Sequence, residues 1–272
     1  MSTRRGARLL FIASLSLLSC RGDRGVQEAQ EAQEAQGGPQ GRLKIFAASS
    51  LRALFSAIVE RDVSGSTSLQ FAGSQRLQQQ LARGARADLF ATADRRHLDS
   101  LMRLGLVADA APLAVGRVAL VVPADGSSPV TDLASLPKAR CLILAAPEVP
   151  AGRYGRALLH RAERLLGEGF AQRALARLCS EEGNVRLVRA KLLLGEADAG
   201  LIYESDLRRS RDGALEPRLR ALPLPPTLQR PVRYWIATLL GSAQPRRAAR
   251  WRARLRSSEG IELLRRFGFE AP

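Results

Sequence analysis

A junction between a short apolar run and a helical pattern, marked by small residues and serines, recurs along this chain and limits the folds open to it. At the first junction, residues 43–46 are typical of a strand, Ala47-Ala48-Ser49-Ser50 follows, and an amphipathic helical pattern begins at Leu51. The start of such a helix directs free backbone N–H groups and the positive end of the helix dipole at one spot, which suits an anion. An ordinary N-cap serine can produce one such junction. The interpretation as an anion site therefore depends on the junction occurring several times along the chain.

Three later junctions repeat the pattern, at Gly73-Ser74, Ala151-Gly152 and Asn184-Val185. The alternating strands and helices around them predict an α/β fold with mainly parallel sheets flanked by helices. In such sheets a ligand binds beyond the carboxyl ends of the strands, where these junctions lie. Because 272 residues are enough for two domains, we expect two junctions from each half to face each other across a cleft.

The N-terminus has the pattern of an export signal. Arg4, Arg5 and Arg8 precede an apolar run over 9–18, which is too short to span a bilayer. The run ends in Leu17-Leu18-Ser19-Cys20, which resembles the lipobox of bacterial lipoproteins. This resemblance implies a signal peptide over 1–19, acylation of Cys20, and a lipid-anchored protein on the periplasmic or cell-surface side of a membrane. The alternative is an ordinary secretory peptide with an incidental cysteine.

Residues 20–42 are predicted to be a linker between the lipid anchor and the folded body. They contain a Gln-Glu-Ala triplet repeat followed by Gly37-Gly38-Pro39, with no apolar face that could pack against a core.

Composition and motifs argue against several other functions. The formal charge of +16 comes mostly from arginines that are scattered, without interleaved aromatics or a nucleic-acid motif, so no nucleic-acid partner is expected. His97 and His160 lie on helical patterns away from the junctions, and Ser50 has no evident base nearby in the pattern. We therefore expect no catalytic triad, no protein-bound metal, no cofactor and no enzymatic activity.

Seven segments together resemble the molybdate-binding protein of bacterial ABC importers, in the same order as in that family. They are 46–51, 71–74, 87–94, 147–154, 184–186, 195–203 and 265–269. The resemblance covers nearly all of 43–269 and implies a two-lobed periplasmic-binding-protein fold of type II, with a two-crossover hinge. Lobe 1 is expected over 43–122 and 229–272, and lobe 2 over 123–228.

The same resemblance implies a tetrahedral oxyanion, molybdate or tungstate, held by uncharged groups only. Carried over by position, the donors are the hydroxyl and N–H of Ser50 and Ser74, the N–H of Ala151 and Val185, and the Tyr203 hydroxyl. Any metal is thus bound only as the oxyanion through these residues. The implied partner is an ABC permease, and the protein is expected to be a monomer.

Two residues depart from the family pattern. Gln75 stands where a second serine is usual, and Glu204 follows Tyr203 near the expected dianion, where we expect it to point outward. Two alternatives remain open: a binder of another tetrahedral oxyanion such as sulfate, and a regulatory lipoprotein with a degenerate cleft, for which Gln75 is the best argument.

Cys141 and Cys179 are the cysteines left after Cys20. In an exported protein they are candidates for a disulfide. The alternative is that both are buried as small hydrophobic residues, and their spacing does not decide between the two.

Overall fold

The computed structural model describes residues 41–61 and 66–272, and Arg42–Pro272 form one compact unit. The predicted signal peptide, Cys20 and almost all of the predicted linker lie outside the described residues. Within the described part, no helix combines the length and the apolar character that crossing a membrane requires.

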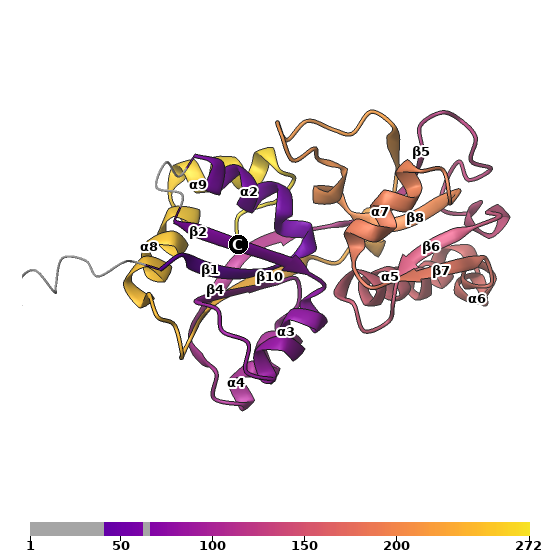
Figure 1. Cartoon of the computed structure of the whole chain (residues 1–272). Coiled ribbons are helices and arrows are strands. Elements are labelled where there is room, and N and C mark those ends of the chain that lie inside the picture. The colour runs from indigo at the N-terminus through magenta and orange to yellow at the C-terminus, as the bar shows by residue number, and fades with distance from the viewer. Residues whose placement is uncertain (1–40, 62–65) are drawn as a thin grey trace, which may run out of the picture. The chain divides into compact units, whose positions relative to one another are not determined.

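The first sheet has five strands in the order β2-β1-β3-β10-β4. Their bounds are β1 (Leu43–Ala48), β2 (Thr67–Ala72), β3 (Leu89–Thr92), β4 (Val107–Gly116) and β10 (Val232–Leu239). The helices that cover it are α2 (Arg52–Glu60), α3 (Ser74–Ala82), α4 (Arg95–Arg103), α8 (Pro245–Leu255) and α9 (Ser258–Arg266). Helices α2 and α9 lie on one face of this sheet, and α3 and α4 lie on the other (Figure 1).

The second sheet also has five strands, in the order β7-β6-β8-β5-β9. Their bounds are β5 (Val118–Pro123), β6 (Leu142–Ala145), β7 (Leu178–Glu182), β8 (Ala199–Tyr203) and β9 (Leu219–Leu222). Helix α7 (Val185–Leu193) covers one face, and α5 (Pro150–Leu166) and α6 (Phe170–Leu175) cover the other (Figure 1). Four short 3-10 turns complete the described elements: η1 (Ser49–Leu51), η2 (Leu136–Lys138), η3 (Glu204–Leu207) and η4 (Pro226–Leu228).

The predicted α/β architecture with two helix-flanked sheets is confirmed, with one difference in strand direction. The sequence predicts mainly parallel sheets, whereas each sheet has two parallel and two antiparallel pairings among its described strands. The antiparallel pairings belong to β10 and β5, the strands next to the two crossings between the sheets. A strand that enters from the other sheet is not bound by the direction that a β–α–β repeat imposes.

The first crossing lies at Arg117, earlier in the chain than the predicted border between 122 and 123. Strand β4 ends at Gly116 in the first sheet, and β5 begins at Val118 in the second. The exposed Arg117 guanidinium donates to Glu270 over 2.8–2.9 Å at this point. Gly116 and Arg117 interrupt the apolar run at this point, but the valine-rich pattern on either side of them obscures the change of sheet.

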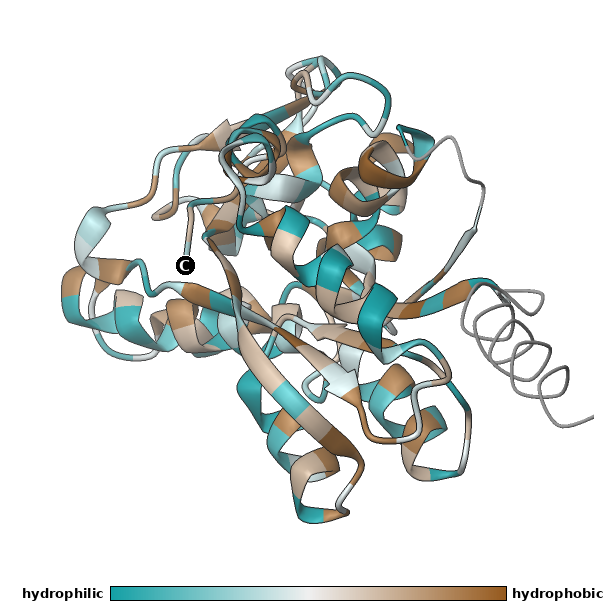
Figure 2. Ribbon diagram, turned by 90° about the vertical axis from the view of Figure 1, so that its left-hand side faces the viewer, coloured by the Kyte–Doolittle hydropathy of each residue, from teal (hydrophilic) through white to brown (hydrophobic). Residues whose placement is uncertain are grey.

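The core is largely aliphatic, as its strands show. Strands β3, β5, β6 and β8 are buried at every residue, which is what near-continuous apolar runs covered on both faces predict. Figure 2 shows strands in mostly hydrophobic colours and helices striped with hydrophilic and hydrophobic residues. This pattern is that of helices packing one face on a sheet.

Cys141 and Cys179 form a disulfide with a Cα–Cα distance of 5.3 Å. Cys141 directly precedes β6 and Cys179 lies in β7, and these two strands pair in parallel. The structure therefore favours the first of the two alternatives that the sequence left open.

Candidate anion-binding site

The five predicted donors line one small cavity, although they are spread over 154 positions of the chain from Ser50 to Tyr203. Ser50 lies in η1, Ser74 and Val185 are the first residues of α3 and α7, Ala151 is the second residue of α5, and Tyr203 ends β8. The other lining residues are Ala48, Ser49, Gly73, Ala93, Val149 and Pro150. Elements around both sheets thus converge on one point, as the carboxyl ends of the parallel strands require.

Backbone N–H groups at helix starts face this cavity. Asn184 caps α7 by accepting hydrogen bonds from the N–H groups of Arg186 (3.0 Å) and Leu187 (3.2 Å). This leaves the N–H of Val185, the first residue of the helix, without a partner among the described residues, as is usual for the first turn. The N–H groups of Ser74 and Ala151 occupy equivalent first-turn positions in α3 and α5.

The position of the Ala151 N–H depends on Gly152. A Cβ at this residue would lie 2.2 Å from the carbonyl oxygens of Ala145 and Ala146. The start of α5 can therefore rest directly on the end of β6 only because residue 152 has no side chain.

Replacement of Gly152 by alanine is expected to lower the free energy of unfolding by about 1–3 kcal/mol, because α5 must move off β6. The Ala151 N–H moves with it, so anion binding should weaken as well. Urea titration and calorimetry measure the two effects. Gly241→Ala is a matched control, because a Cβ at Gly241 meets nothing within 4 Å. If Gly152→Ala behaves like this control, the close contact does not position the donor.

Both serine hydroxyls accept a hydrogen bond from the protein. Ser74 Oγ accepts from the N–H of Ala93 over 3.2 Å, and Ser50 Oγ accepts from the hydroxyl of Tyr234 over 3.1 Å. A hydroxyl has one proton to donate, and an oxygen that already accepts from a neighbour is left with that proton for another acceptor. Ser50 and Ser74, which are only 3% and 2% exposed, are thereby oriented to donate to a ligand.

The Tyr203 hydroxyl is the clearest sign of a missing acceptor. It is buried and has no hydrogen-bond partner in the described part of the chain. Burial, with Tyr234 nearby, raises the pKa of Tyr203 well above its ordinary value, so the phenol stays protonated and can donate. An unpaired buried hydroxyl costs about 1–3 kcal/mol, a cost that an anionic ligand would remove.

No arginine, lysine or carboxylate side chain belongs to the residues that line this cavity. A buried carboxyl lies close to one of the lining residues, Tyr203. Asp206 is fully buried, and burial raises its pKa to about 6 while Arg186 and Arg189 oppose the rise. Its nearest cationic atom is Nη1 of Arg186, at 3.9 Å. Glu204 is exposed and is not among the lining residues, which agrees with the expectation that it points outward.

Residues 43–270 match the family model described as bacterial extracellular solute-binding protein. The chain belongs to this family. The molybdate-binding protein ModA of Mycobacterium tuberculosis is 30% identical to it over 234 residues, which are 84% of either chain. This relative supports the resemblance that the ordered sequence segments predict.

Two solved structures with the same fold are named for different anions. The periplasmic molybdate-binding protein of Azotobacter vinelandii matches with a TM-score of 0.73 at 17% identity, over 85% of this chain and 100% of that one. The sulfate-binding protein SubI of Mycobacterium tuberculosis matches with a TM-score of 0.72 at 17% identity, over 85% of this chain and 87% of that one. The common fold therefore does not distinguish between the two anions.

Gln75, the departure from the family pattern, does not line the cavity. Its side-chain Nε2 donates to the carbonyl oxygen of Gly183 over 3.0 Å. Gly183 lies just before the cap of α7, so the amide connects the start of α3 with the turn before α7. The ion pair between Asp94, the N-cap of α4, and Arg153 in α5 makes a second such connection. Both contacts join elements of the first sheet to elements of the second.

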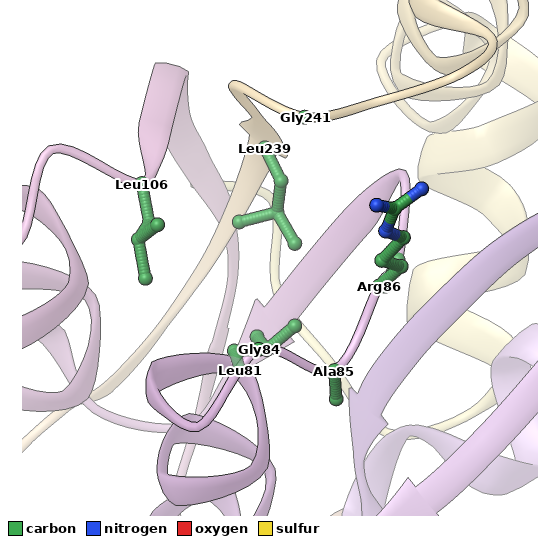
Figure 3. A pocket seen from close by; sticks show the side chains of 8 residues that line it. Leu81, Gly84, Ala85, Arg86, Leu106, Leu239 and Gly241 are labelled. Atoms are coloured by element: carbon green, nitrogen blue, oxygen red, sulfur yellow. The ribbon is translucent and has the colours of Figure 1, made fainter.

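A larger cavity of about 380 Å³ lies elsewhere, next to the end of α3 and the end of β10. Its lining is mostly apolar, with Leu106 and Leu239 extending into the gap near Leu81 and the guanidinium of Arg86 off to one side (Figure 3). None of the predicted donors lines it. The smaller cavity is therefore the candidate site, since only there do hydrogen-bond donors converge.

The structure also shows residues around the site that the sequence did not single out. Tyr234 lies in β10 and Asp206 in η3, and neither belongs to the segments that resemble the family. The signal available for Tyr234 is a polar aromatic residue within a mostly apolar strand, because a buried tyrosine hydroxyl usually has a hydrogen-bond partner. Within the described residues, no group of three histidine, cysteine or acidic side chains is placed to hold a metal ion.

Proposed function

We propose that this protein captures a tetrahedral dianion, molybdate or tungstate, in the cavity lined by Ser50, Ser74, Ala151, Val185 and Tyr203, and delivers it to an ABC permease without catalysing a reaction. The observation that carries the proposal is the convergence of uncharged donors from elements around both sheets, one of them a buried tyrosine hydroxyl without a partner. The ModA relative, which is named for molybdate binding, supports the choice of ligand.

The donor set suits a fully ionised oxyanion. A buried dianion must be compensated by hydrogen bonds, because its desolvation is very costly otherwise. N–H groups and hydroxyls can all donate to deprotonated oxygens, whereas an oxyanion that carries a proton would point that proton at one of them. Each helix N-terminus adds about 0.3–1 kcal/mol, and up to about 2 kcal/mol when partly buried. A shell without a full positive charge also favours release, which delivery to a permease requires.

The size of the cavity implies movement. The space that the donors enclose is about 10 Å³, roughly the room needed for one water molecule. A four-oxygen anion needs more, so the halves around the two sheets must separate for entry and close again around the ligand. We propose the hinge at the two crossings between the sheets, with one lobe formed by 43–117 and 229–272 and the other by 118–228.

The N-terminal predictions complete the proposal. Acylation of Cys20 and the linker over 20–42 would hold the folded body near a membrane outside the cytoplasm, within reach of the permease. The family, which is one of extracellular proteins, supports export, and the lipobox-like segment supports the anchor. A monomer is sufficient, because all five donors come from a single chain.

Sulfate is the second candidate ligand, and the SubI structure is the observation that favours it. Sulfate has the same shape and charge as molybdate but is smaller, so the closed cavity must discriminate by size.

Calorimetric titration with molybdate, tungstate, sulfate and phosphate tests the proposed function on protein lacking residues 1–20. We expect strong binding of the first two and far weaker binding of the others, with a matching rise in thermal stability. A response to sulfate alone would assign the cavity to the second candidate. No response to any of the four anions would remove the proposed function, and the regulatory lipoprotein with a degenerate cleft would then be the better hypothesis.

A further inference from the structure

Tyr234 is a fully buried tyrosine that contacts two of the proposed donors. It lies in β10 of the first sheet, and its hydroxyl donates to Ser50 Oγ over 3.1 Å. Its ring meets the ring of Tyr203, from the second sheet, edge to face with centroids 6.0 Å apart. Phe269 packs on the Tyr234 ring in the same manner, with centroids 5.2 Å apart. One side chain is therefore in contact with a donor from each sheet.

The direction of the Tyr234–Ser50 hydrogen bond determines what Ser50 can offer to an anion. While Tyr234 donates, Ser50 Oγ acts as the acceptor, and the serine proton is available for a ligand. If the bond were reversed, Ser50 would donate its proton to Tyr234 and would present only lone pairs to the anion. The reversed arrangement would replace an attraction by a repulsion.

The surroundings of Tyr234 keep its proton in place. Burial, with the buried carboxyl of Asp206 nearby, raises the pKa of Tyr234 well above its ordinary value, so the phenol remains a donor. Ser74 Oγ likewise accepts a hydrogen bond, from the N–H of Ala93, and a backbone N–H can only donate. For Ser50 the corresponding donor is a side chain, which makes it accessible to mutation.

We propose that Tyr234 is a positioning residue for anion binding: its hydroxyl holds Ser50 in the donating orientation, and its ring supports Tyr203. This inference rests on the proposed function of the cavity. It assigns no contact between Tyr234 and the anion, because Tyr234 is not among the lining residues.

The test is a double-mutant cycle with Tyr234→Phe and Ser50→Ala, measured by calorimetric titration with molybdate. Phenylalanine retains the ring contacts and removes only the hydroxyl, so the fold should be preserved. We expect Tyr234→Phe alone to weaken binding about three- to tenfold, and to have little further effect in the Ser50→Ala background. Ser56→Ala in α2 is the control, since Ser56 is not among the residues that line the cavity; it should bind like the wild type.

The outcomes separate this inference from the proposed function. Wild-type protein that binds molybdate, with Tyr234→Phe binding equally well, would overturn the positioning role alone. An equal loss in both backgrounds would also overturn it, because a general structural effect does not depend on the Ser50 hydroxyl. Absence of binding by the wild type to any of the four oxyanions would overturn both proposals.

Discussion

Removal of a single hydroxyl from the donor set, by Ser50→Ala, Ser74→Ala or Tyr203→Phe, is expected to weaken molybdate binding by about 1–3 kcal/mol. The physical reason is that a charged oxygen in a closed cavity is left short of one donor. The loss corresponds to a roughly 5- to 150-fold increase in Kd, which titration calorimetry resolves. Ser56→Ala in α2, outside the lining residues, is the matched control.

The three variants should differ in how they affect the protein without ligand. Ser74→Ala leaves the N–H of Ala93 without its acceptor, so the free energy of unfolding should fall. Tyr203→Phe removes a hydroxyl that has no partner in the described part of the chain, so the free energy of unfolding should stay the same or rise. Loss of affinity without loss of stability in Tyr203→Phe would mark this hydroxyl as reserved for a ligand. Unchanged affinity in all three variants would place the binding site elsewhere.

The second large effect concerns the disulfide between Cys141 and Cys179. Replacing both cysteines by serine should lower the free energy of unfolding by about 2–4 kcal/mol. The bond closes a loop with a sequence separation of 38 residues, and losing it enlarges the conformational freedom of the unfolded chain. Guanidinium titrations of oxidised protein, reduced protein and the double serine variant measure the change.

Reduced wild type and the double variant should have the same midpoint, below that of the oxidised protein. Coincidence of all three midpoints would show that the bond contributes nothing to stability. Anion affinity should be nearly unaffected, because neither cysteine lines the candidate cavity.

Local features of the chain were sufficient to predict the helix starts that meet at the site. Ser50, Ser74 and Val185 each follow a strand and precede an apolar helical pattern, and that information is contained in a few neighbouring residues. The rule that carboxyl ends of parallel strands gather at one edge then predicts their convergence. The choice of Ser50 over Ser49 and the inclusion of Tyr203 came from the family resemblance.

Contacts between residues far apart in the chain could not be predicted from the sequence. The contact between Tyr234 and Ser50 spans 184 positions, and that between Gln75 and Gly183 spans 108. No local periodicity encodes such pairs. The break at Arg117 was missed for a different reason. The residues on either side of it are mostly apolar and buried, and Gly116-Arg117 alone is too short a signal to separate two strands.

The contacts of Gln75 with Gly183 and of Asp94 with Arg153 bear on how long an anion would stay in the proposed site. They connect the two halves through an amide and an ion pair that do not involve the anion, so part of the energy of closure is independent of occupancy. If the cavity binds an anion as proposed, release requires both contacts to break, so they should lengthen the residence time of the anion. Because the Arg153 and Asp94 side chains are only 27% and 6% exposed, salt should screen this pair weakly, and the dissociation rate should depend little on ionic strength.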